Sequence, residues 1–141
     1  MDRRIVPFRR WHYDWLVEQD AAEGGMFRLS PQVAAQAEHE NTWTAVVDGA
    51  PVACAGTIQY WPGRHMAWAY IVRGARRHMA WITKEVLKAL GKVKGRVELT
   101  VRCGFPAGQR WAVRLGFVVE TPVLRAFGPE GEDHIGYVRL G

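Results

Sequence analysis

The residues best placed to do chemistry form a basic cluster between an apolar run and a segment with helical periodicity. The cluster comprises Arg73, Arg76, Arg77 and His78. Free N–H groups at a helix start attract anions, and guanidinium groups bind phosphate oxygens through charge-assisted hydrogen bonds. This stretch therefore predicts an anion site, and a solvated basic turn is the alternative.

The elements on either side of the cluster are a strand and a helix. Residues 69–72 are apolar and precede Arg73-Gly74, which is typical of a strand followed by a turn. In the next segment apolar residues recur at steps of three, four and four, which puts them on one helical face. These residues are Met79, Ile82, Val86 and Leu90, and Gly91 marks the helix end.

The rest of the chain predicts a sheet with flanking helices. Strands are expected at residues 3–6, 42–47, 51–61, 65–72, 96–102, 117–121, 123–127 and 135–140. Further helices are expected at residues 7–18, from Ser30-Pro31 to about residue 38, and at 109–115. Asp48-Gly49 predicts a hairpin turn, and the order strand, helix, strand in the middle of the chain predicts one parallel pair.

The composition indicates one globular unit. The 141 residues are 48% hydrophobic and 23% charged, so we expect a single domain over residues 1–141. No apolar run approaches the roughly 20 residues of a membrane span, and we expect a cytoplasmic protein without a membrane partner. The net charge of +5 is compatible with nucleic acid, an acidic protein surface or a phosphorylated ligand, although no nucleic-acid-binding motif is present.

Other familiar chemistries have little support. Ser30 is the only serine and is expected to cap a helix, which disfavours a serine triad. Cys54 and Cys103 are expected on strands as reduced, buried thiols, because they lack CxxC spacing. The five histidines show no metal-ligand spacing, so no metal site is expected.

Two segments in the last third of the chain resemble the GNAT superfamily, the Gcn5-related N-acetyltransferases. They are Arg114-Leu115-Gly116-Phe117, followed by Glu120, and the closing segment from Asp133 to Arg139. Together with the order of elements, this resemblance implies an α+β (mixed α/β), GNAT-like fold. Such a fold has a central, largely antiparallel sheet of six to seven strands, a parallel splayed pair in its middle and about four flanking helices.

The same resemblance implies where acetyl-CoA, the acyl donor of the family, binds. In that family the backbone equivalent to residues 69–72 holds the pantetheine arm, and the following turn holds the pyrophosphate. The implied cofactor-binding residues are Ile71, Val72, Arg73, Gly74, Arg76, Arg77, His78 and Met79.

This turn departs from the family's phosphate loop, which has small residues at fixed positions. Depending on the register, the glycine position of that loop is occupied here by His78 or Met79. A side chain at this position blocks the approach of backbone amides to phosphate. Arg76 and Arg77 can compensate by supplying charge directly.

Two residues are candidates for proton transfer. Glu98 is the candidate general base, a role that requires a raised pKa near neutral pH. The alternative is a strand-surface carboxylate paired with Arg102 or a lysine. Many members of the family carry a tyrosine general acid where this chain has Ala112, which leaves Tyr70 as a candidate donor. Tyr137 is a further possibility.

Two functional hypotheses follow from the resemblance. The first is an acyl-CoA-dependent, GNAT-type N-acyltransferase that transfers an acetyl group to a small-molecule or protein amine. The second is a catalytically inactive GNAT-fold protein of a phage or prophage that serves as a virion or interaction component. The first predicts a cytoplasmic enzyme, and the second predicts a virion protein with other virion proteins as partners.

Overall fold

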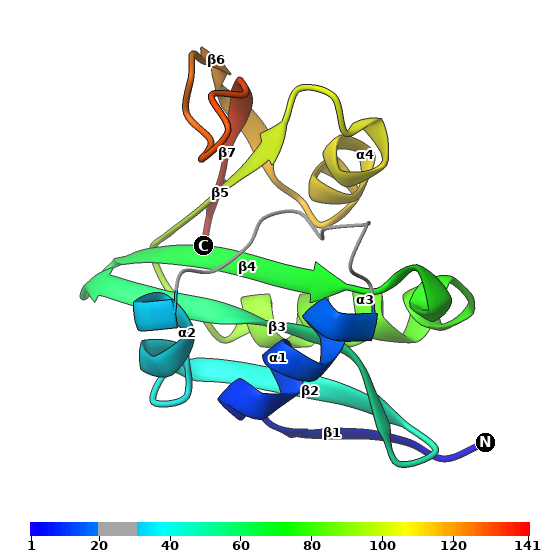
Figure 1. Ribbon diagram of the computed structural model, residues 1–141. Helices are drawn as coiled ribbons and strands as arrows, with labels where there is room; N and C mark the ends of the chain where they lie inside the picture. The colour runs from blue at the N-terminus through cyan, green and yellow to red at the C-terminus, as the bar shows by residue number, and fades with distance from the viewer. Residues whose placement is uncertain (20–30) are drawn as a thin grey trace.

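The centre of the molecule is a seven-stranded mixed sheet. A computed structural model describes residues 1–19 and 31–141, and its strands lie in the order β1-β2-β3-β4-β5-β7-β6 (Figure 1). Their bounds are β1 Arg3–Pro7, β2 Asn41–Val47, β3 Ala50–Trp61, β4 Arg64–Ile71, β5 Arg96–Arg102, β6 Val118–Leu124 and β7 His134–Leu140. All neighbouring strands are antiparallel except β4 and β5, which confirms the predicted fold class.

Helices cover both faces of the sheet. The described residues form four α-helices and one 3₁₀ helix: α1 Arg10–Gln19, α2 Pro31–Ala37, η1 Arg73–His78, α3 Met79–Gly91 and α4 Pro106–Arg114. Figure 1 shows α1 and α2 in front of β3 and β4, with α3 behind the sheet. The helices thus divide the apolar side chains between two layers.

Alternation along the central strands fills these two layers. On β3 and β4, Cys54 and Tyr70 face α1 and belong to one apolar cluster. Ala53 and Ala69 belong to the other cluster, together with Ile82 of α3. Strand residues two apart share a face, so one continuous run of residues supplies both layers.

The periodicity of α3 predicts its packing correctly. Ile82 and Leu90 are fully or almost fully buried, and Met79 and Val86 pack against the same core. The Asp48-Gly49 hairpin is also confirmed, with positive φ angles of 48° and 86°. Two consecutive positive φ angles are those of a type I′ turn, which follows the twist of the two strands.

Three boundaries differ from the prediction. Helix α1 begins at Arg10 and not at Pro7, because β1 continues through Pro7, which pairs with Trp43. Helix α4 begins at Pro106, because proline at a first helical position is favourable and loses no hydrogen bond there. The two strands expected at residues 117–121 and 123–127 are one strand, β6 Val118–Leu124, with register shifts against β7 on both sides of Thr121.

The two cysteines differ in burial. Cys54 is buried on β3 as predicted, but Cys103 is exposed in the turn after β5, so its predicted burial is wrong. That turn is fixed by hydrogen bonds from Cys103 N–H to the Asp133 carbonyl and from Phe105 N–H to the Arg102 carbonyl. Ser30 lies outside the described residues. No described helix is long and apolar enough to cross a membrane.

Candidate functional site

A gap opens between β4 and β5 in the middle of the sheet. The two parallel strands pair only from Arg64 and Arg96 to Met66 and Glu98. Both strands then continue, β4 to Ile71 and β5 to Arg102, and Figure 1 shows them diverging. Beyond Met66, therefore, no strand among the described residues pairs with the edge of β4 that faces β5.

Backbone groups of β4 point into this gap. Val72 N–H donates to the Val52 carbonyl, which places the polar backbone groups of Val72 on the β3 side. Successive residues of a strand direct these groups to opposite sides, so those of Ala69 and Ile71 point toward β5. An extended ligand arm in the gap can form hydrogen bonds with them as an added strand does.

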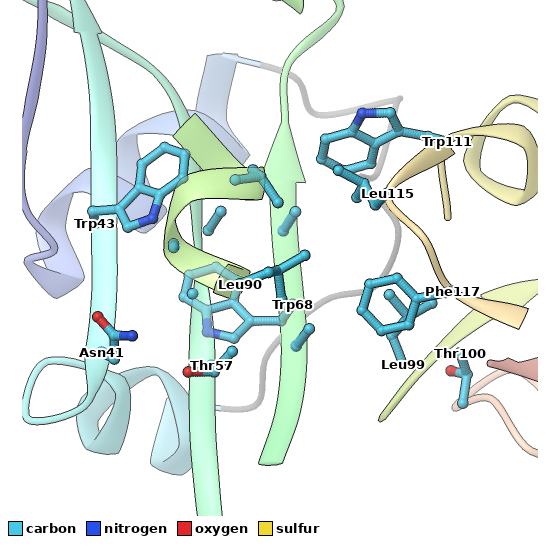
Figure 2. A pocket seen from close by; sticks show the side chains of 16 residues that line it. Asn41, Trp43, Thr57, Trp68, Leu90, Leu99, Thr100, Trp111, Leu115 and Phe117 are labelled. Carbon is cyan, nitrogen blue, oxygen red and sulfur yellow. The ribbon is translucent and has the colours of Figure 1, made fainter. Parts of the chain in front are cut away.

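An apolar cavity of about 40 Å³ lies beside the gap. Its walls come from the sheet, from α3 and from α4. Figure 2 shows Leu99, Leu115 and Phe117 on one side of the cavity and Trp43 on another. Its lining also includes the hydroxyl-bearing residues Thr57 and Thr100. The volume holds a few atoms, so the cavity suits a small apolar group and excludes bulk water.

The basic turn at the end of β4 is a 3₁₀ helix that continues directly into α3. Ala75 N–H donates to the Val72 carbonyl at 3.0 Å, and Met79 N–H donates to the Arg76 carbonyl. These two amides are therefore engaged within the chain. A Cβ built on Gly74 would meet no atom within 4 Å, so the backbone there is open to a ligand.

The charged side chains of this turn divide into an exposed and a buried set. Arg76 and Arg77 are exposed and can reach a phosphate. His78 is buried, and its Nδ1 lies 3.0 Å from Nη2 of Arg3, whose guanidinium donates the hydrogen bond. Burial lowers the pKa of His78, and the charges of Arg3 and Arg77 lower it further. The imidazole is therefore neutral at pH 7 and adds no positive charge to the site.

Arg3 is a site residue that the sequence did not indicate. It comes from β1, and its guanidinium also lies over the Trp81 ring of α3, at 5.6 Å from the ring centroid. The contact joins residues 75 positions apart in the chain. No local spacing could have signalled it.

Glu98 lies where the β4–β5 pairing ends, between two guanidinium groups. Arg64 donates two hydrogen bonds to its carboxylate, at 2.7 and 2.9 Å, and Arg96 donates a third. Arg96 also binds Glu120 of β6. These hydrogen bonds lower the pKa of Glu98 despite its partial burial, and the hydrogen bonds from Arg64 contribute most. The carboxylate thus has a lowered pKa where a base acting near neutral pH requires a raised one.

The tyrosine candidates lie in the core. Tyr70 is fully buried beneath α1, with its ring edge-on to Tyr13 at 5.3 Å. Tyr137 is buried in the cluster on the α3 side, and burial raises its pKa. Ala112 of α4 is also buried. The structure therefore does not bring the predicted site residues together. Tyr70 lies in the layer of α1, the basic turn follows the end of β4, and Glu98 lies where the β4–β5 pairing ends.

Solved structures with the same architecture are acetyltransferases. Ard1 from Thermoplasma volcanium superimposes with a TM-score of 0.78 and 15% identity, covering 99% of this chain and 97% of that one. The ribosomal-protein-S18-alanine N-acetyltransferase from Escherichia coli gives 0.70 and 18%, covering 97% and 92%. A GNAT-family acetyltransferase from Bacillus anthracis gives 0.69 and 11%, covering 99% and 95%.

These likenesses show that the chain has the GNAT fold over almost its whole length. The parallel pair that splays in the middle of a mostly antiparallel sheet is the element of that fold on which the candidate site is built. No family model matches the sequence, and no curated protein matches it either.

Proposed function

We propose that the protein is an acyl-CoA-dependent N-acyltransferase that uses acetyl-CoA and acetylates an amine. The observation that carries the proposal is the β4 edge at residues 67–71, which borders an apolar cavity and pairs with no strand in the described part of the chain on the side of β5. Support also comes from the fold, because the Escherichia coli protein above is named as an alanine N-acetyltransferase.

The residues of the gap fit the parts of acetyl-CoA. Backbone groups of Ala69 and Ile71 can hold the amides of the pantetheine arm, since both present a donor and an acceptor to the gap. Arg76 and Arg77 are exposed beside the open backbone of Gly74, where they can bind the pyrophosphate. The bound thioester would supply an activated acyl group.

The chain's own residues then have distinct tasks. The cavity walls at Leu99 and Phe117 exclude water, which protects a thioester from hydrolysis and favours attack by an amine. The β4 backbone orients the acyl group for direct attack. The roles of Glu98 as general base and of Tyr70 as proton donor remain predictions. The pH dependence of a Glu98→Gln variant tests the role of Glu98.

Calorimetric titration of the full chain with acetyl-CoA and with CoA tests the proposal. Saturable binding is expected for both ligands. Replacing Arg76 and Arg77 with glutamate should weaken binding roughly tenfold or more per lost contact. The matched control reverses the charge of the exposed Lys92 and Lys94, at the far end of α3, and should leave affinity unchanged. Absence of heat at millimolar ligand, in a folded sample, would refute the proposal.

The acceptor is sought separately with a panel of amines. A peptide with N-terminal alanine, a lysine-containing peptide and a polyamine cover the chemical classes that an N-acetyltransferase can accept. Thiol release from acetyl-CoA measures turnover with each compound. The alternative function, a virion component, has no supporting feature in the fold or in the matched structures named above, and it stays a prediction for mass spectrometry of purified particles.

A further inference from the structure

A histidine at the start of β7 lies between a hydroxyl and a carboxylate. His134 is buried, with 4% of its surface exposed, and its Nδ1 lies 3.0 Å from Oγ1 of Thr100. Its Nε2 lies 3.5 Å from Oε1 of Glu132. Nε2 is fully buried and has no hydrogen-bond partner among the described residues. The imidazole thus lies between a hydroxyl of β5 and a carboxylate of the β6–β7 connection.

The turn before β7 is shaped to hold the carboxylate in this array. Glu130 N–H donates to Oε2 of Glu132 at 3.2 Å, which leaves Oε1 directed at the histidine. A Cβ on Gly128 would overlap the Glu132 carboxylate, so only glycine permits this arrangement. Gly128 N–H and the Glu132 carbonyl close the turn with a 3.0 Å hydrogen bond.

The charges around the histidine determine which nitrogen carries the proton. Burial raises the pKa of Glu132, but backbone N–H groups and His134 outweigh it, and the net shift is downward. The resulting carboxylate favours a proton on Nε2, which leaves the Nδ1 lone pair to accept a hydrogen bond from Thr100.

The other groups that face His134 do not compete for this role. Arg102 is its register partner on β5, but that side chain is exposed and its guanidinium lies over Phe105 at 5.6 Å. Asp133 accepts a hydrogen bond from Ala126 N–H. The partner on β6 is the apolar Leu124.

Thr100 connects this array to the candidate acyl site. It lies on β5 just beyond the last residue that pairs with β4, and it lines the cavity beside the gap. Figure 2 shows Thr100 next to Leu99. Because side chains alternate along a strand, Thr100 projects from the face of β5 opposite Leu99, and the proposed step requires the amine to approach from that face.

We propose that Thr100, His134 and Glu132 form the proton-accepting chain for the acceptor amine, with Thr100 in contact with the substrate. The inference rests on the proposed function and adds a route for the proton. His134 acts through Thr100, and Glu132 stabilises the imidazolium by its charge.

The amine nitrogen forms a bond to the thioester carbonyl carbon, and the carbon–sulfur bond breaks. The amine proton passes to Thr100 Oγ1 while the hydroxyl proton of Thr100 passes to Nδ1 of His134. The imidazolium then returns one proton to the departing thiolate through Thr100 or water, so the products are an amide and a free thiol.

The first test is the pH dependence of kcat/KM with acetyl-CoA and methoxyamine, a primary amine that is uncharged across the working range. The wild-type value should rise with pH, because an imidazole accepts a proton only in its neutral form. His134→Gln should abolish this rise and lower the plateau by roughly 10²- to 10⁴-fold. Affinity for CoA should not change.

Further variants separate proton transfer from packing. Thr100→Val should lower kcat, as His134→Gln does. Thr100→Ser keeps the hydroxyl and should retain the wild-type kcat. Glu132→Gln should lower kcat/KM, because the imidazolium that forms during proton transfer loses the negative charge beside it. The matched controls are His39→Gln, at an exposed position, and Thr121→Val on β6, both of which should retain the wild-type profile.

A second readout does not depend on turnover. Nitrogen-15 spectra of the histidine side chains report which ring nitrogen carries the proton. We expect the Nε2–H tautomer for His134 in the free protein, and a change in its Nδ1 resonance when CoA is added. The Nδ1–H tautomer would overturn the inference.

The outcomes distinguish this inference from the proposed function. If CoA does not bind, both fail. If CoA binds and methoxyamine is acetylated, but His134→Gln keeps the wild-type pH profile, only the proton chain is refuted. If CoA binds but methoxyamine is not acetylated, no amine proton is transferred, and the proposed proton chain of Thr100, His134 and Glu132 is refuted as well. Should His134→Gln fail to fold, a wild-type kcat/KM in Glu132→Gln still overturns the proton chain.

Discussion

Replacing Glu98 with glutamine removes the negative charge between two guanidinium groups and keeps the shape of the side chain. In the wild type the carboxylate accepts two hydrogen bonds from Arg64 and one from Arg96. The carboxylate side chain is 20% exposed, and each guanidinium side chain is 35% exposed, so water screens part of the interaction. We expect a loss of about 1–2 kcal/mol in the free energy of unfolding.

The loss should depend on pH with a defined sign. The folded-state pKa of Glu98 is below the ordinary value of 4.5, so its stabilisation is complete above pH 4.5. The stabilisation disappears as the pH falls through the lowered pKa. The difference between wild type and Glu98→Gln should therefore be constant near neutrality and shrink in acid.

Urea unfolding at a series of pH values measures this difference. At pH 7 the variant should also melt about 3–6 °C lower than the wild type. Glu85→Gln is the control. Among the described residues, Glu85 forms an ion pair with Lys88, whose side chain is 70% exposed. It should cost less than about 0.5 kcal/mol.

The same variant tests the predicted role of Glu98 as general base. If Glu98 is a paired carboxylate, Glu98→Gln keeps the pH dependence of kcat/KM near neutrality. A stability difference that persists unchanged to low pH would refute the ion-pair account. Loss of the neutral pH dependence in Glu98→Gln would instead support the base assignment and contradict our description of the site.

Three further predictions concern the scaffold. Ile82→Ala, at a fully buried position on α3, should cost about 2–5 kcal/mol in urea unfolding, whereas Leu87→Ala, 39% exposed on the same helix, should cost much less. Gly56→Ala should lower the free energy of unfolding by about 1–3 kcal/mol, because a Cβ there comes within 2.6 Å of the Asn41 carbonyl oxygen. In the control, Gly91→Ala, the added Cβ meets no atom within 4 Å, and the variant should melt close to wild type. Burial, and then the charge of Arg9, lower the pKa of His12, so stability should fall as the pH drops below 6.5, and a His12→Gln variant should lack that slope.

The sequence predicted those parts of the fold that depend on local pattern. The alternation of residues 96–102 matched β5 at both ends, and the spacing along α3 identified its buried face. The Asp48-Gly49 turn was found because two positive φ angles favour this residue pair. Such features need only neighbours in the chain.

Features that depend on distant contacts were missed. The 3₁₀ helix of the basic turn is built by short-range hydrogen bonds, but the burial of His78 within it depends on packing and on Arg3 of β1. Glu98 was identified as a candidate from its strand, yet its pKa depends on Arg64, which is 34 positions away. The pairing of His134 with Thr100 likewise requires the β5–β7 register.

The proposed function places the pantetheine arm of acetyl-CoA in the gap between β4 and β5. Backbone amide spectra of the labelled full chain, recorded during titration with CoA, report on this gap residue by residue. We expect saturable shifts at Ala69 and Ile71, with smaller changes at Val52, whose carbonyl already binds β4. Unchanged Ala69 and Ile71 amides at millimolar CoA would contradict this placement.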